Sequence, residues 1–184
     1  ARAQIGALYQ SLRNVSDPVL IIENKLLYRE RAASALPPGY TRLESNGPFP
    51  TTVLTPSGKA DITVVAFGRM SALAERVAAA VFDEEEIVLE LIFPLLVSPL
   101  DSVPIRESVA RTGKLLVVEE GAESFDLASE VIATVATRYS GSAPLRVRRV
   151  GAHPAPIPSS MELERVVLPG ESSVAAACLE LFDA

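Results

Sequence analysis

The sequence has a single cysteine, Cys178, and a single histidine, His153. One cysteine excludes a disulfide within the chain, which fits a reducing compartment and predicts a cytoplasmic protein. With one thiol and one imidazole, a zinc site built from nitrogen and sulfur ligands is excluded as well. Small apolar residues surround Cys178, so we interpret it as a buried hydrophobe and not as a nucleophile.

Recognisable catalytic motifs are also missing. A Ser-His-Asp triad would have to use His153, and nothing near it resembles a nucleophile elbow. The stretch "AFGRMSAL" places one glycine between a predicted strand and a predicted helix. A dinucleotide fingerprint needs three spaced glycines and a P-loop needs Gly-Lys-Ser/Thr, so Gly68 is interpreted as a turn residue.

Positive charge is scarce, with 17 lysines and arginines against 23 acidic residues and a net charge of −6. An acidic chain without a basic cluster argues against nucleic acid and against anionic membrane surfaces as partners. The densest basic stretch contains Arg146, Arg148 and Arg149, and the alternate spacing of Arg146 and Arg148 favours the solvated face of a strand. The longest apolar run, "LIFPLLV", is broken by Pro94 and falls short of the roughly 18 residues of a membrane span.

Strands and helices alternate regularly in the second part of the chain. Near-continuous apolar runs predict buried strands, each followed by an amphipathic helix, which indicates an α/β domain with a mostly parallel sheet covered on both faces. The predicted strands are 61–67, 87–93, 115–119 and 145–150, and the predicted helices are 71–85, 100–113, 125–139 and 172–182.

Capping residues support these helices. Asp101 or Ser102 is the candidate N-cap of the second helix, Pro104 falls in its first turn, and Gly113 ends it. Asp126 is the candidate N-cap of the third helix.

The first part of the chain is organised differently. A helical apolar spacing over 1–14 is followed by "SDP" and then by "VLIIE", which predicts a buried strand over 19–23. From 31 to 58 prolines and glycines crowd together, so this segment is interpreted as a linker or an extended crossing segment with a domain boundary inside it.

Paired carboxylates end the third predicted strand, in "LLVVEEG". Such a pair can serve as general acid and base, as metal ligands, or as a solvated turn. Neighbouring strand residues point to opposite faces, which is poor geometry for a shared proton or metal. A structural or interface role is therefore favoured for Glu119 and Glu120, although one carboxylate at a sheet edge could still meet a ligand.

Several blocks carry a family resemblance. "ADITVVAFGRMSALAERVA", "VSPLDSVPIRESVARTGKLLVVEEG", "RVGAHPAPIPSS" and "VVLP" resemble, in order and spacing, the C-terminal part of thiamine-dependent 2-oxoacid dehydrogenase β subunits of the pyruvate, branched-chain and acetoin type. "DPVLIIENKLLYRE" resembles the segment just before it. The resemblance implies a three-layer α/β/α fold like the transketolase C-terminal domain, with one antiparallel strand.

The same resemblance implies a division of the chain and a function. Residues 1–58 would be a remnant of a pyrimidine-binding domain plus a linker, and 59–184 would be the transketolase C-terminal-like domain. The full enzyme would decarboxylate a 2-oxo acid oxidatively on thiamine diphosphate and Mg²⁺ and pass the acyl group to a lipoyl arm. Its partners would be an α subunit, a second β subunit and a dihydrolipoyl acyltransferase core.

The family's catalytic residues match nothing in this chain, so the chain alone is expected to be inactive and to serve assembly and docking. The resemblance assigns Glu119 and Glu120 to an interface. It also implies a monovalent cation site at Leu12, Val15 and Asp17, held largely through main-chain oxygens. The alternatives are a stand-alone interaction or regulatory module of the same fold, or part of another thiamine enzyme such as transketolase.

Overall fold

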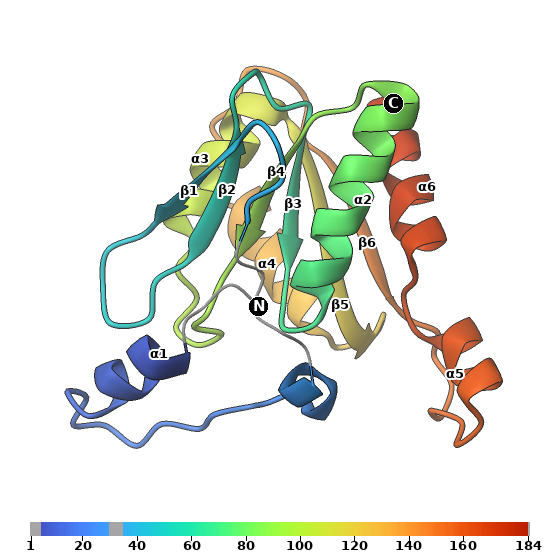
Figure 1. Cartoon of the computed structure of the whole chain (residues 1–184). Helices are drawn as coiled ribbons and strands as arrows, with labels where there is room; N and C mark the ends of the chain where they lie inside the picture. The colour runs from blue at the N-terminus through green and yellow to red at the C-terminus, as the bar shows by residue number, and fades with distance from the viewer. Residues whose placement is uncertain (1–4, 30–34, 184) are drawn as a thin grey trace.

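A computed structural model describes residues 5–29 and 35–183 (Figure 1). Its centre is a six-stranded sheet in the order β1-β2-β4-β3-β5-β6. The strands are β1 Tyr40–Glu44, β2 Thr52–Pro56, β3 Ile62–Ala66, β4 Leu89–Phe93, β5 Lys114–Ala122 and β6 Arg146–Ala152. The helices are α1 Ile5–Leu12, α2 Met70–Glu85, α3 Val103–Thr112, α4 Leu127–Ala136, α5 Met161–Val167 and α6 Glu171–Phe182, with a short 3₁₀ helix, η1 Lys25–Arg29.

The sheet lies between two helical layers, which confirms the three-layer α/β/α prediction. One core joins the sheet to α2 and α6, and a second core on the other face joins it to α3 and α4 (Figure 1). Every residue of β3 and of β4 is buried, because helices cover both faces of the central strands. This double burial explains why these strands are almost continuous apolar runs in the sequence.

The strand directions agree with the family resemblance. β4, β3, β5 and β6 are parallel, whereas β2 pairs antiparallel with β4 and with β1. β2 is therefore the antiparallel strand that the resemblance implied without locating it. The parallel strands all end at the lower edge of the sheet in Figure 1, where α1, η1 and α5 also lie.

The helix ends largely follow the sequence. Gly113 ends α3 with a positive φ of 71°, and Asp126 caps α4 by accepting a hydrogen bond from Ser129 N at 2.8 Å. Ser102 occupies the N-cap position of α3 but makes no capping hydrogen bond through its side chain. Here Pro104 lies in the first turn, where its missing N–H leaves no helical bond unmade.

The segment interpreted as a linker or extended crossing segment contains the β1–β2 hairpin, whose strands pair antiparallel from Tyr40–Pro56 to Glu44–Thr52. Of the prolines in this segment, Pro48 and Pro50 lie in the connecting turn and Pro56 ends β2, whereas Pro37 and Pro38 precede β1. Ser45 closes the turn by accepting a hydrogen bond from Thr51 N through its Oγ at 2.9 Å. Prolines in these places interrupt the pattern in the sequence without removing ladder donors from the strand interior.

The strand predicted over 19–23 was also wrong. No strand forms there in the described residues, and Leu20 and Ile22 are 85% and 84% exposed. A strand needs a hydrogen-bonded neighbour, and no described strand of the sheet lies against this segment. The short helix α5, which follows the proline-rich loop, was not predicted, because its seven residues are too few for apolar spacing to mark a helix. None of its residues is buried.

Polar side chains form a buried cluster beneath α3. Glu90 on β4 is almost fully buried, and its carboxylate accepts hydrogen bonds from Arg111 at 2.5 Å and from Thr55 at 3.0 Å. The hydroxyls of Ser108 and Thr112 are 2.7 Å and 2.8 Å from that of Thr63 on β3. These contacts fix α3 on the sheet through hydrogen bonds in addition to apolar packing.

In the described part of the chain, no helix is long and apolar enough to cross a membrane.

Candidate functional site

The two carboxylates at the end of β5 point to opposite faces of the sheet, as the alternation of a strand predicts. Glu119 contacts the start of α4, and Glu120 contacts the segment that precedes η1. Their hydrogen-bond partners are 104 positions apart in the chain. Glu119 and Glu120 therefore do not share a proton or a metal ion with each other.

Glu119 anchors the N-terminus of α4. It is 8% exposed, and its Oε1 accepts a hydrogen bond from Ala128 N at 2.7 Å. Burial raises the pKa of Glu119, and the nearby Asp126 raises it further, while the hydrogen bonds from Ala128 and Leu127 work in the opposite direction. A helix N-terminus leaves main-chain donors without helical partners, and Glu119 satisfies one of them.

Asp126 serves the same helix end from the loop. Burial opposes its ionisation, but hydrogen bonds from Ser129 and the charge of Arg149 leave the pKa of Asp126 lowered. Its Oδ1 accepts from Ser129 N at 2.8 Å, and its Oδ2 lies 3.6 Å from the Arg149 guanidinium. Two carboxylates thus lie at the positive end of the α4 dipole, where negative charge is favourable.

Glu120 joins the N-terminal segment to the sheet. Its Oε2 accepts a hydrogen bond from Asn24 Nδ2 at 2.6 Å, and its Oε1 lies 3.7 Å from the guanidinium of Arg69 before α2. Asn24 in turn accepts a hydrogen bond from Leu26 N at 3.0 Å, which holds the start of η1. Sequence reasoning identified Glu120 but missed Asn24, because the 96 positions between them carry no pattern that links the two.

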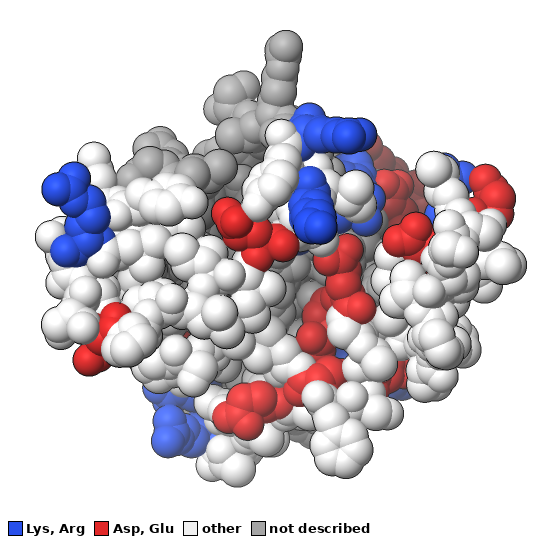
Figure 2. All heavy atoms as spheres, turned by 90° about the horizontal axis from the view of Figure 1, so that it is seen from below, with Lys and Arg blue, Asp and Glu red and all other residues white. Residues whose placement is uncertain are grey.

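The surrounding face carries a band of acidic side chains, with basic ones beside it. Figure 2 looks at the edge where the parallel strands end, and acidic side chains form a band across its middle. Exposed apolar residues lie in the same N-terminal segment, including Leu20, Ile22, Leu26 and Tyr28. Large exposed apolar groups close together are typical of a surface that packs against another protein or domain.

The predicted cation ligands lie where α1 ends. Val15 N donates a long hydrogen bond of 3.4 Å to the Leu12 carbonyl, and Asp17 is exposed in the following turn. A carbonyl oxygen has a second lone pair, so Leu12 could still bind a cation. The site stays a prediction; a higher thermal unfolding midpoint in KCl than in choline chloride of equal concentration would support it, and equal midpoints would exclude it.

No group of three His, Cys, Asp or Glu side chains among the described residues could hold a metal ion.

The fold defines an α/β domain built on a mixed six-stranded sheet. The family model for "Transketolase, C-terminal domain" matches residues 52–174, about two thirds of the chain, and the chain belongs to this family.

Similar proteins agree with this assignment. The chain is 32% identical to the pyruvate dehydrogenase E1 component subunit beta of Pisum sativum, over 94% of the chain and 46% of the relative. It is 33% identical to the acetoin:2,6-dichlorophenolindophenol oxidoreductase subunit beta of Cupriavidus necator, over 94% of the chain and 48% of the relative. A solved structure of a split-gene transketolase, an inactive β4 tetramer, superimposes with a TM-score of 0.60 at 25% identity, over 68% of this chain and 40% of that one.

The chain thus spans about half the length of the curated relatives it matches. It is homologous to β subunits of thiamine-dependent 2-oxoacid dehydrogenases, as the residue blocks predicted.

Proposed function

We propose that this chain acts as the C-terminal part of the β subunit of a 2-oxoacid dehydrogenase first component. The whole enzyme would decarboxylate a 2-oxo acid on thiamine diphosphate and transfer the acyl group to a lipoyl arm. The observation that carries the proposal is the match to pyruvate and acetoin dehydrogenase-type β subunits over 94% of the chain. The thiamine chemistry belongs to other parts of that enzyme.

The role proposed for this chain is assembly and docking. The exposed apolar residues of 19–29 would pack against the pyrimidine-binding domain or a second β subunit, because burying such residues removes apolar surface from water. The acidic band in Figure 2 favours a docking partner with a basic surface, which we propose to be the dihydrolipoyl acyltransferase core. Arginine- and lysine-rich partners would be steered to this face by its charge.

Affinity capture from native cell extract tests the proposal. An antibody against the chain should recover an α subunit and a dihydrolipoyl acyltransferase from the cytosolic fraction, and the captured material should turn over a 2-oxo acid from a panel of such substrates. The purified 184-residue chain should show no heat of binding with thiamine diphosphate and Mg²⁺. Turnover of ketose phosphates in place of 2-oxo acids would instead support a transketolase, the class of the superimposed solved structure. Recovery of neither an α subunit nor a dihydrolipoyl acyltransferase would support a stand-alone module.

The interface role predicted for Glu119 and Glu120 stays a prediction, and we carry it forward on Glu120, since Glu119 is buried inside its own chain. Charge reversal by Glu120→Lys should place a cation beside Arg69 and break the hydrogen bond from Asn24. We expect the released N-terminal segment to weaken assembly with the α subunit about ten-fold, or ~1.4 kcal/mol, as measured by surface plasmon resonance.

Glu123→Lys is the matched control, because Glu123 is an exposed acid three positions away with the same charge change. An unchanged affinity for Glu120→Lys, or an equal loss for both variants, would remove Glu120 from the interface. Affinity for thiamine diphosphate in the assembled enzyme should be the same for both.

A further inference from the structure

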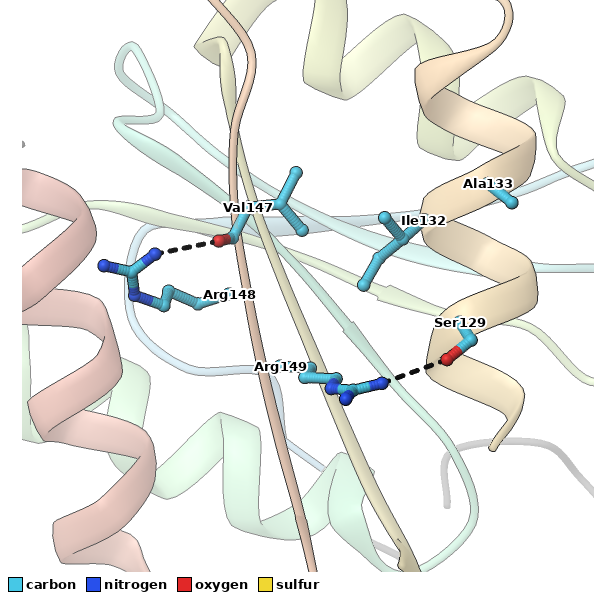
Figure 3. A pocket seen from close by; sticks show the side chains of 6 residues that line it. All are labelled: Ser129, Ile132, Ala133, Val147, Arg148 and Arg149. Carbon is cyan, nitrogen blue, oxygen red and sulfur yellow. Dashed lines mark hydrogen bonds between the residues drawn. The ribbon is translucent and has the colours of Figure 1, made fainter. Parts of the chain in front are cut away.

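The strand β6 lies at one end of the sheet, and no described strand pairs with its outer edge. Arg146 N donates to Gly113 O at 2.9 Å, on the side of β5. Because main-chain groups alternate along a strand, those of Val147 and Arg149 point away from β5. The Val147 carbonyl accepts a hydrogen bond from the guanidinium of Arg148 at 3.2 Å, which agrees with this outward direction (Figure 3).

A groove runs beside this open edge. Its volume is about 380 Å³. Figure 3 shows the side chains that line it, which come from β6 and α4. Ile132 and Val147 pack partly buried against the core and give the groove an apolar floor. Arg149 lies across one end and donates a hydrogen bond to Ser129 Oγ at 3.0 Å.

Cations concentrate along this edge of an otherwise acidic chain. Arg146, Arg148 and Arg149 are all exposed, while the chain as a whole carries −6. Arg148 pairs with Glu180 at 3.0 Å, and both side chains are more than half exposed. Exposed pairs of this kind contribute little to stability, so an incoming carboxylate can replace Glu180 at little cost.

The charges decide between two possible occupants. A second copy pairing edge to edge would bring the same three arginines into opposition, and like charges directly opposite each other destabilise a strand pair. An extended segment rich in Asp and Glu would instead meet main-chain groups that no described strand pairs, an apolar floor and three guanidinium groups. Strand addition of this kind takes its affinity from main-chain hydrogen bonds and its selectivity from side-chain contacts.

We propose that the outer edge of β6 and the groove beside α4 bind an extended acidic segment of a partner protein by strand addition. This surface is separate from the end of β5 proposed above for assembly, and it accepts the opposite charge. Arg149 and Arg148 would contact carboxylates on the two faces of the added strand, and Val147 would supply the outward main-chain donor and acceptor.

A peptide-binding experiment with the 184-residue chain tests this surface. The probe is a fluorescein-labelled peptide of Glu and Val, about the length of β6, with Glu at both odd and even positions so that both faces of the added strand carry carboxylates. The control peptide carries Lys in place of Glu. Fluorescence anisotropy should show the acidic peptide binding at least about ten-fold more tightly than the basic one, with affinity falling as salt rises. Absence of binding at about 1 mM peptide, or equal binding of both peptides, would overturn the proposal.

Variants of Val147 separate strand addition from simple charge attraction. Val147→Pro removes the outward N–H but leaves the donors toward β5 on Arg146, Arg148 and Val150 in place, and proline is tolerated on edge strands. We expect it to weaken the acidic peptide about ten-fold, whereas Val147→Thr, which keeps the N–H and the β-branched shape, should bind like the parent. If Val147→Pro does not fold, as judged by circular dichroism, the double variant Arg148→Gln/Arg149→Gln should lose about as much. Parent-like binding by a folded Val147→Pro, or a dimer in sedimentation that Val147→Pro abolishes, would overturn the proposed acidic occupant.

Discussion

Replacing Arg111 by alanine is expected to lower the free energy of unfolding by about 3 kcal/mol, because it leaves a buried carboxylate without its counter-charge. The partner, Glu90, has a side chain only 3% exposed, whereas that of Arg111 is 60% exposed. The carboxylate would keep the hydrogen bond from Thr55 at 3.0 Å and lose the one from Arg111. Urea denaturation followed by circular dichroism measures the change.

The difference in exposure predicts that the two partners are not equivalent. Glu90→Gln removes the buried charge and leaves Arg111 free to meet water, so we expect a loss of only about 1 kcal/mol. In the double variant Arg111→Ala/Glu90→Gln no charge is left buried, and most of the damage done by Arg111→Ala should be recovered. Purely additive losses in this double-mutant cycle would show that burial of the charge is not the cause.

Replacing Glu119 by alanine should destabilise the protein by about 2 kcal/mol, because the buried N–H of Ala128 loses its acceptor. Ala128 is 1% exposed, so water cannot readily replace the carboxylate at this helix end. Glu119→Gln keeps an oxygen in nearly the same place and should retain most of the stability at neutral pH. Thermal unfolding of both variants beside the parent measures the difference, and equal losses for alanine and glutamine would mean that the negative charge is what matters.

The pH dependence gives Glu119 a further expected effect. Burial raises its pKa in the folded state above the ordinary value of 4.5, so the folded protein holds this proton more tightly than the unfolded chain does. Its contribution to stability is therefore full below pH 4.5 and is lost as the pH rises through the raised pKa. Glu119→Gln cannot titrate, so its stability relative to the parent should increase over that interval.

Asp126 works in the opposite sense in the same place. Its pKa is lowered from 3.8, so its contribution is present above that value and is lost as the pH falls through the lower folded value.

A stability difference between Glu119→Gln and parent that stays constant from pH 4 to 7 would contradict the raised pKa of Glu119.

Much of the central fold could be predicted from local pattern. The buried parallel strands are continuous apolar runs, since helices cover both of their faces, and Asp126 and Gly113 mark helix ends by chemistry that acts within a few residues. The hairpin β1–β2 was hidden because its prolines lie in the turn and at a strand end. The strand predicted over 19–23 was wrong because an apolar run is typical of a strand but is not sufficient for one. A strand also needs a neighbouring strand to pair with, and this segment has none among the described strands.

The candidate site likewise has features that the sequence predicted and features that it did not. The alternation of a strand was enough to predict that Glu119 and Glu120 diverge. Their partners could not be predicted, because Ala128 is reached only when α4 packs back on β5, and Asn24 lies 96 positions from Glu120. Arg146 and Arg148 of β6 were predicted to lie on one solvated face of a strand, yet nothing local indicated that this strand would end the sheet.

The sequence by itself determined the alternation of strands and helices, the family to which the chain belongs and the residues that end its helices. These depend on side-chain periodicity and on contacts within about one helical turn, which the order of residues specifies directly. Only the tertiary structure decided which strand runs antiparallel, which carboxylate is buried and which strand edge stays open. Strand order and burial arise from contacts between residues far apart in the chain, and those exist only once the sheet has assembled.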